Sequence, residues 1–285
     1  MLHSDHLAQF LENLKYERRA SAHTLRNYEG DLRHFLRYLA TQQEPTTTRE
    51  SIRAWLSALH DSYSRNSVTR KLAAVKTFCQ YLTRNNLIDS NPAALIASPR
   101  RERRLPKYLS RSNVTMLLEA PDISTDQGKR DRAILELLYA TGIRVSELVS
   151  LKLSDLDLAT RLLNVKKNHF TDRTIPFGEP AREALESYLN IRGHFLPTHA
   201  DLFISYLGVP LTSRAIHRIV ATYTKNIGPA NPRILRHSFA WHLVDRGIDH
   251  RTLQTLLGHK QIISTTSTYG SSLEALRDVY DLATS

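Results

Sequence analysis

The chain has 285 residues, which is long for one domain and comfortable for two. Its hydrophobic content of 41% supports packed cores, and no uninterrupted apolar stretch approaches the roughly 20 residues needed to span a bilayer. The formal net charge of +11 predicts a polyanionic partner, and the absence of a membrane span and of a signal-peptide pattern places the chain in the cytoplasm. The single cysteine, Cys79, excludes an intramolecular disulfide and is expected to be buried.

The first ninety-odd residues carry four apolar stripes with the i, i+3, i+4, i+7 spacing of amphipathic helices. The stripes lie at residues 7–14, 25–39, 52–59 and 68–82. Ser21 or Thr24 is available to cap the second helix. The fourth stripe is surrounded by basic side chains that agree in sign with the net charge, and we predict that they bind DNA: Arg65, Arg70, Lys71 and Lys76.

A basic segment follows Asn91-Pro92 and separates this helical block from the rest. Between Ser98 and Arg111 there are six bases and one acid, and two prolines bracket the run. We expect an extended linker over residues 98–108 that lies along a DNA backbone and draws affinity from phosphate neutralisation. The residues expected to do so are Arg100, Arg101, Arg103 and Arg104. A solvated tether is the alternative interpretation of the same run.

The second block, residues 109–285, is also predicted to be mainly helical. A buried helix ends at Thr141-Gly142, where glycine suits a C-cap. The stretches 162–165 and 173–177 predict a β-hairpin, which would make a small antiparallel sheet. Further helices are expected near residues 180–191, 212–226, 234–246, 250–257 and 272–281.

Four residues in this block have the chemistry of phosphoryl transfer through a tyrosine. Arg144 stands in TGIRVSEL, Arg236 in LRHSFAWHLV, His259 directly after Gly258, and Tyr269 ten residues further on. Guanidinium groups bind the non-bridging oxygens of a phosphodiester bidentately, and a tyrosine can form a covalent intermediate. Glu147 is expected to orient or cap rather than react, and His237 to have a structural role.

Longer segments resemble the tyrosine recombinase (phage integrase) family, most closely its Xer branch. They are RDRAILELLYATGIRVSELVSLKLSDL, LRHSFAWHLVDRGIDHRTLQTLLGH, and TLRNYEGDLRHFLRYL near the N-terminus. The resemblance covers nearly the whole chain and implies a mainly α, two-domain DNA clamp. Residues 1–97 would form a helical SAM-like core DNA-binding domain, 98–108 the linker, and 109–285 a mixed α/β catalytic domain with a small antiparallel sheet.

The resemblance also implies roles for single residues. Arg144 and Arg236 would clamp the scissile phosphate, His259 would assist, and Tyr269 would be the nucleophile. The family's general-acid lysine lies in the hairpin, where an ungapped count falls on Asn168, so Lys167 is the predicted acid and Lys166 the second candidate. Asn168 at the lysine place is one departure from the family pattern, and Arg233, which stands where a histidine is usual, is another. In addition, the spacing from His259 to Tyr269 is one residue longer than in close relatives.

The activity implied is site-specific recombination of double-stranded DNA through a 3′-phosphotyrosyl intermediate, without metal, ATP or other cofactor. Four protomers would act on two sites, alone or with a second recombinase, and helix 272–281 would dock on a neighbouring protomer. The expected role is the resolution of chromosome or plasmid dimers on nucleoid DNA, in chromosome partition at cell division. Three alternatives stay open: a mobile-element integrase, a topoisomerase-like relaxing enzyme, and a DNA-binding relative that has lost cleavage through Arg233 and Asn168.

Overall fold

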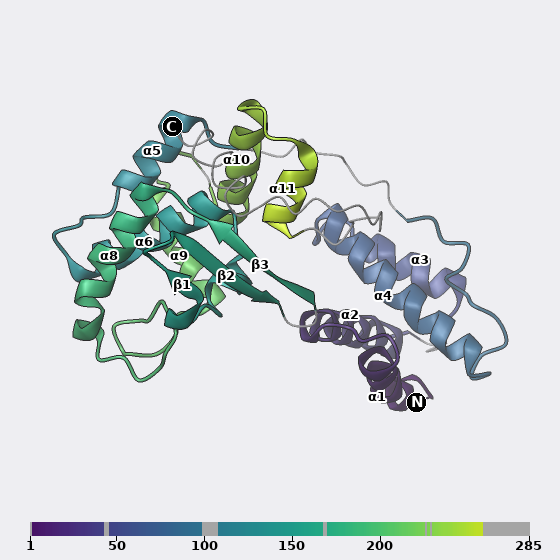
Figure 1. Cartoon of the computed structure of the whole chain (residues 1–285). Helices are drawn as coiled ribbons and strands as arrows, with labels where there is room; N and C mark the ends of the chain where they lie inside the picture. The colour runs from purple at the N-terminus through teal and green to yellow at the C-terminus, as the bar shows by residue number, and fades with distance from the viewer. Residues whose placement is uncertain are drawn as a thin grey trace. The chain divides into compact units, whose positions relative to one another are not determined.

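The chain divides into two compact units, Met1–Arg104 and Leu105–Ser285. The computed structural model describes residues 2–42, 46–98, 108–167, 170–225, 227–228 and 230–258 (Figure 1). Most of these residues are helical, and a three-stranded antiparallel sheet lies in the second unit, so the predicted mainly α fold with a small sheet is confirmed. No helix among the described residues is both long and apolar enough to cross a membrane.

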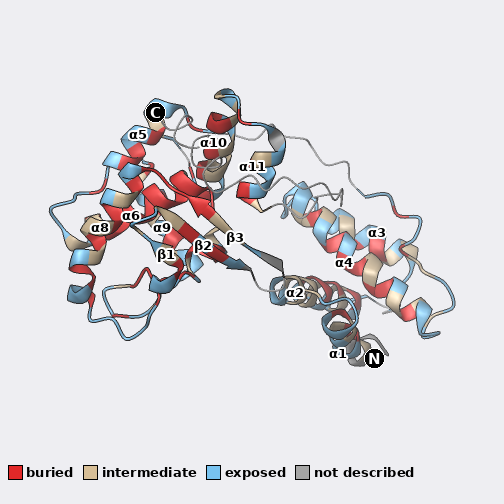
Figure 2. Cartoon of the chain, viewed as in Figure 1, coloured by how far each residue is buried: buried red, intermediate tan, exposed pale blue. Residues whose placement is uncertain are grey.

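The first unit is built from four helices that share one apolar core. The helices are α1 (Leu2–Tyr16), α2 (Ala22–Ala40), α3 (Arg49–Ala58) and α4 (Arg65–Arg84). Serine or threonine hydroxyls begin three of them, as when Ser21 accepts a hydrogen bond from the Thr24 backbone N–H at the start of α2. Figure 2 shows the amphipathic pattern on α4, where buried and exposed segments alternate. Cys79 is fully buried in this core, as predicted.

The second unit, which we call the catalytic unit after the expectation from the resemblance, combines helices with the three-stranded sheet. Its helices are α5 (Arg111–Glu119), α6 (Asp126–Thr141), α7 (Val145–Leu148), η1 (Leu153–Asp155), α8 (Glu179–Ile191), η2 (Arg192–Phe195), α9 (Ser213–Tyr223), α10 (Pro232–Asp245) and α11 (His250–Leu257). Its strands are β1 (Leu156–Asp157), β2 (Leu162–Lys167) and β3 (Phe170–Pro176). Helix α10 begins earlier than its apolar spacing indicates, because Asn231 caps it and Pro232 fits the first helical position.

The sheet has the order β1-β2-β3 with both pairs antiparallel. Leu163 pairs with Ile175 and Val165 with Arg173, which confirms the predicted hairpin. The register shifts between Val165 and Lys167, close to the end of β2. Strand β1 was not predicted, since its two residues are too short to show an alternating pattern.

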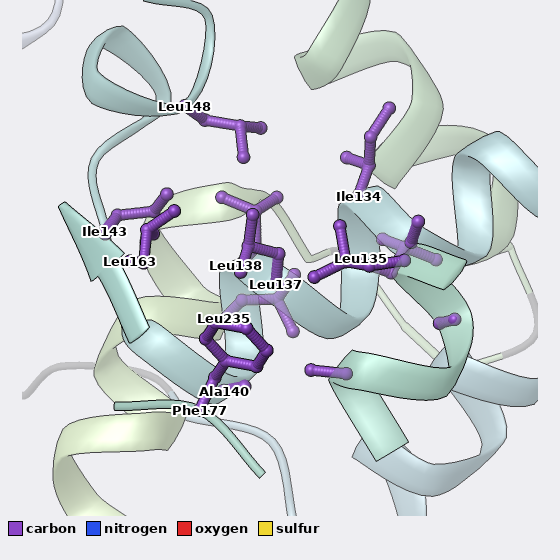
Figure 3. Close-up of a cluster of buried hydrophobic side chains, with 14 of the residues drawn as sticks. Ile134, Leu135, Leu137, Leu138, Ala140, Ile143, Leu148, Leu163, Phe177 and Leu235 are labelled. Carbon is purple, nitrogen blue, oxygen red and sulfur yellow. The ribbon is translucent and has the colours of Figure 1, made fainter. Parts of the chain in front are cut away.

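Helix α6 runs through the core of the catalytic unit and positions the segment that follows it. Ile134, Leu135 and Leu137 are fully buried, and Figure 3 shows them within the cluster that also includes Ile143 and Leu148. Because Ile143 and Leu148 are each 1% exposed, the short segment between them is anchored at both ends. That segment contains Arg144 and Glu147.

Candidate active site

Gly142 allows the chain to turn at the end of α6 and to approach α10 closely. Its φ of +58° is the left-handed C-cap conformation that glycine adopts without steric cost. A Cβ built at Gly142 would lie 2.4 Å from the Phe239 ring of α10, so a side chain there would force the two helices apart. The predicted glycine stop is therefore confirmed, and it also sets the distance between α6 and the helix that bears Arg236.

Arg144 and Glu147 form the start of α7 together. Arg144 is the N-cap residue, and the Glu147 carboxylate accepts a hydrogen bond from the Arg144 backbone N–H at 2.8 Å. The same carboxylate accepts a second bond from Arg144 Nη1 at 3.0 Å. The predicted capping and orienting role of Glu147 is confirmed. The Arg144 side chain stays 37% exposed, so part of its guanidinium faces solvent.

Arg236 extends from α10 to the ends of two other helices. Its Nη1 donates to the Gly142 carbonyl at 2.5 Å, and its Nη2 donates to the Leu257 carbonyl at 2.6 Å. Burial lowers the pKa of Arg236 to about 10, and the neighbouring Arg144 charge adds to the effect. The guanidinium is still protonated at neutral pH, and a bound anion would relieve the unfavourable potential around it.

The end of α11 is the point where these side chains converge. Helix C-termini leave their last carbonyls without intrahelical partners and carry partial negative charge. Here three successive carbonyls each accept from a different arginine: Leu256 from Arg173 Nε at 3.0 Å, Leu257 from Arg236, and Gly258 from Arg144 Nη2 at 3.2 Å. The predicted clamp arginines therefore lie in one site, together with a third arginine.

Arg173 was not among the predicted site residues. It lies in β3 and donates Nη1 and Nη2 to the two oxygens of Glu147 at 3.0 and 2.9 Å. One signal was available in the sequence. Arg173 stands two and four residues before Ile175 and Phe177, which are buried hydrophobic residues, so it is expected on the same inward face of the strand. An arginine on the inward face of a strand needs a buried partner. That partner is Glu147.

The electrostatics of Glu147 follow from its neighbours. Burial alone would raise the pKa of this carboxyl, but the Arg173 hydrogen bonds, the Arg144 backbone N–H and the charges of both arginines lower it to about 2. Glu147 is therefore ionised at any physiological pH. One carboxylate and three arginines leave the site with a positive excess, which suits a phosphodiester.

Arg233 and His237 lie one turn apart on α10. Arg233 is exposed, and its Nε donates to His237 Nε2 at 3.3 Å. Accepting this bond requires a neutral ring nitrogen, and the pKa of His237 is lowered by burial and by the charges of Arg233 and Arg236. Arg233 and Arg236 are three residues apart and so share a helix face. The predicted structural role of His237 agrees with this bond.

The structure describes the side chain of Lys166 but not that of Lys167, the other hairpin lysine. Lys166 forms an ion pair with Asp155 at 2.7 Å, and this pair raises the Lys166 pKa. Lys167 is the last residue of β2, and its side chain is outside the described part. Asn168, on which the ungapped count falls, is outside it too. The same holds for the other predicted site residues of this unit and of the linker: His259, Tyr269, Arg100, Arg101, Arg103 and Arg104. Among the described residues there is no cluster that could hold a metal ion.

The four predicted DNA-binding residues of α4 are not equivalent. Arg65 is exposed at the helix start, and Lys76 lies on the same face three turns later and is half-buried. Arg70 is 42% exposed and pairs with Asp31. Lys71 is buried, with its Nζ 3.2 Å from Asp31 and 4.8 Å from the Tyr63 ring centroid. Its position inside the helical unit argues against the prediction for Lys71, because a buried ammonium held by a carboxylate does not face a phosphate.

Comparisons with known proteins match both units of the chain to domain models of one family. The Phage integrase family model matches residues 107–275, and its N-terminal SAM-like domain model matches residues 7–86. The chain is 38% identical over 287 residues to the tyrosine recombinase XerC of Pelobacter propionicus, covering 98% of this chain and 95% of the relative. It is also 38% identical over 289 residues to the tyrosine recombinase XerD of Halalkalibacterium halodurans, covering 97% and 96%.

The chain belongs to the tyrosine recombinase family. A lambda integrase tetramer bound to a Holliday junction has a similar fold, with a TM-score of 0.71 and 21% identity over 92% of this chain and 79% of that one. The resemblance seen in the sequence is confirmed, and the protein is a site-specific, DNA strand-transferring recombinase of the Xer type. Arg144 and Arg236 converge in the unit that the Phage integrase family model matches.

Proposed function

We propose that this recombinase cuts and rejoins duplex DNA with Tyr269 as the nucleophile and with Arg144 and Arg236 as the phosphate clamp. The observation that carries the proposal is the meeting of these two arginines, from α7 and α10, at the end of α11. Helix α11 ends at Leu257, so the chain leaves the clamp only twelve positions before Tyr269. A nucleophile that follows the clamp so closely can reach the phosphorus held in it.

The chemistry follows from these positions. The Tyr269 oxygen attacks phosphorus, the bond to the 5′ oxygen breaks, and a 3′-phosphotyrosyl link forms. The two guanidinium groups stabilise the charge that develops on the non-bridging oxygens. His259 assists with the tyrosine proton, and Lys167 protonates the departing 5′ oxygen. Lys166 is the weaker candidate for this acid because Asp155 already binds its ammonium group.

Strand exchange needs more than one protomer, since the freed 5′ hydroxyl must attack a partner duplex. The lambda integrase relative is described as a tetramer on a Holliday junction. By analogy, we propose four copies of this chain on two sites in the cytoplasm, alone or with a second recombinase, and docking of residues 272–281 on a neighbouring protomer. Equal identity to a XerC and a XerD protein favours dimer resolution over mobile-element integration.

Covalent trapping tests the proposal. The duplex that the protein selects from a random pool is synthesised with a nick beside each candidate cleavage position, so that the released end diffuses away. Wild type and Tyr280→Phe are expected to form a covalent protein–DNA adduct on denaturing gels, because Tyr280 has the helical spacing of a packing residue. Tyr269→Phe is expected to bind the duplex and form none.

The opposite results are equally informative. An adduct in Tyr269→Phe would show that another residue is the nucleophile. Tight binding by wild type with no adduct on any nicked duplex would instead favour the DNA-binding relative without cleavage, for which Arg233 at the usual histidine position is the motivation. Arginine stays charged at working pH and is a poor proton carrier.

A further inference from the structure

Arg173 connects three parts of the catalytic unit through one largely buried guanidinium. It is anchored in β3 opposite Val165 of β2. Its Nη1 and Nη2 bind the two Glu147 oxygens at the start of α7, and its Nε binds the Leu256 carbonyl at the end of α11. The side chain is only 10% exposed. Solvent is therefore not its main partner, and its bonds join the hairpin, the Arg144 segment and the last turn of α11.

We propose that Arg173 is a positioning residue for strand cleavage, which holds Glu147 and the end of α11 where Arg144 and Arg236 can grip the scissile phosphate. The proposal rests on the proposed cleavage function and adds a residue that does not itself contact the reacting atoms. Arg173 acts through two intermediaries, the Glu147 carboxylate and the Leu256 carbonyl. Glu147 also accepts a hydrogen bond from Arg144. Leu256 is next to Leu257, whose carbonyl accepts from Arg236.

The geometry requires arginine at this position. A guanidinium presents a planar set of donors that can bind both oxygens of one carboxylate and still leave Nε for a third acceptor. A lysine ammonium would keep the charge but could not bridge the same acceptors in the same plane. Gly258 leaves space for the group, since a Cβ there would lie 2.9 Å from Arg173 Nη1. The residue that ends α11 thus also admits the Arg173 side chain.

Loss of the Arg173 bonds would act on the clamp in two ways. Glu147 Oε1 accepts from both Arg144 and Arg173, so removing Arg173 leaves the carboxylate to attract Arg144 more strongly. The Leu256 carbonyl would also lose its donor, which frees the last turn of α11 beside the Arg236 bond to Leu257. Both changes displace groups that must bind the transition state, whereas the many other bases of the chain still hold the DNA backbone.

A second buried arginine in the same unit provides a matched control. Arg192 of η2 is 8% exposed and donates to the carbonyls of His199 at 2.9 Å and Leu202 at 3.3 Å. It resembles Arg173 in burial and in binding backbone carbonyls. Its hydrogen-bond acceptors are the carbonyls of His199, Asp201 and Leu202, which lie outside α7 and α11, so its role is confined to the loop after η2.

The main test compares Arg173→Lys with Arg192→Lys in the full chain. Single-turnover adduct formation on the nicked duplex is measured at saturating protein, DNA affinity is measured separately, and thermal unfolding gives the folded fraction. Arg173→Lys is expected to slow cleavage by about 10²-fold, as small misplacements of catalytic groups do, with affinity near that of wild type. Arg192→Lys is expected to lower stability and to cleave at the wild-type rate per folded molecule. Equal rates for Arg173→Lys and wild type, or equal losses in both variants, would overturn the proposal.

The pH profile separates positioning from simple structural support. Among the described residues, the charged groups around Glu147 are Arg144, Arg173 and Arg236. Arg173→Gln removes the strongest of the interactions that lower the pKa of Glu147, so burial shifts this pKa upward. The variant is expected to lose cleavage more steeply than wild type as the pH falls below 7, because Glu147 of the wild type remains ionised there. Parallel profiles for the two proteins would contradict a role through Glu147.

Two further measurements test the proposal if the Arg173 variants do not fold or if wild type forms no adduct. If neither Arg173 variant folds, Gly258→Ala is used instead, because its Cβ crowds the Arg173 guanidinium without removing it. This variant is expected to cleave slowly and to bind DNA with normal affinity. Cleavage at the normal rate would count against the proposal. If wild type forms no adduct, the cleavage function fails, and hydrogen exchange then tests positioning alone. The amides of Leu256 to Gly258 should exchange faster in Arg173→Lys than in wild type, and unchanged exchange would refute the link to α11.

Discussion

Asp31 in the helical unit and Glu147 in the catalytic unit are both buried carboxylates that pair with two cations. Asp31 binds Arg70 and Lys71 directly, and the Lys71 ammonium also packs over the Tyr63 ring. Glu147 binds Arg144 and Arg173. In sequence the two clusters look alike, since each consists of an acid and bases on amphipathic elements.

The difference lies in the remaining partners of the cations. In the Asp31 cluster both cations pair with the full negative charge of one carboxylate. In the Glu147 cluster, Arg144 and the neighbouring Arg236 also donate to neutral backbone carbonyls of Gly142, Leu257 and Gly258. A phosphate oxygen is a stronger acceptor than a carbonyl, so it can replace these bonds with a gain. A partly exposed cation that donates to carbonyls is thus available to a substrate, whereas one held by a buried carboxylate stabilises the fold.

The largest effect is expected from truncating the clamp. Arg144→Ala and Arg236→Ala each remove a charge-assisted donor from the transition state, and comparable losses elsewhere cost about 10²–10³-fold in rate. Arg70→Ala removes an arginine of similar exposure to Arg144 from the Asp31 cluster and is expected to leave the rate of cleavage of bound DNA unchanged. Single-turnover adduct formation measures all three. Cleavage at the normal rate by Arg144→Ala would show that exposure and carbonyl partners do not identify the clamp.

The next largest effect is expected on the free energy of unfolding and on its dependence on pH. The folded pKa of Glu147 is about 2 and its ordinary value is 4.5, so its ionisation favours the folded state by on the order of 3 kcal/mol above pH 5. This contribution is lost as the pH falls from about 5 through 2, because the unfolded chain takes up the proton first. Glu147→Gln should therefore destabilise the catalytic unit strongly at pH 7 and much less at pH 3, as measured by urea unfolding at both pH values. An equal loss at both would assign the effect to packing rather than charge.

Much of the fold could be predicted because it depends on local patterns. The helical stripes, the glycine stop at Gly142 and the hairpin at 162–177 each follow from spacing or from turn chemistry within a few residues. Arg144 and Arg236 were predicted by resemblance, and the structure brings them together at α11.

Other features depend on contacts between distant segments, and their partners have no local signature. Arg173 lies 26 residues from Glu147 and 83 from Leu256, so its role follows only from the folded arrangement. Lys71 was predicted to bind DNA because its sign agrees with the net charge. Its burial is due to Asp31, which lies on α2 and turns a surface-type residue into a core ion pair.

The smallest effect distinguishes two lysines on one helix. Lys76 lies on the face of α4 that begins with exposed Arg65, whereas Lys71 is bound to Asp31 inside the unit. A lysine that neutralises one phosphate contributes about 0.9 to the slope of log K against log salt for duplex DNA. Lys76→Met is therefore expected to reduce this slope by about 0.9, and Lys71→Met to leave it unchanged in protein that is still folded. Thermal unfolding is measured in parallel, since Lys71→Met also disturbs a buried pair. A reduced slope in Lys71→Met would mean that its ammonium leaves Asp31 when DNA binds, and the distinction between carbonyl-held and carboxylate-held cations would fail in the helical unit.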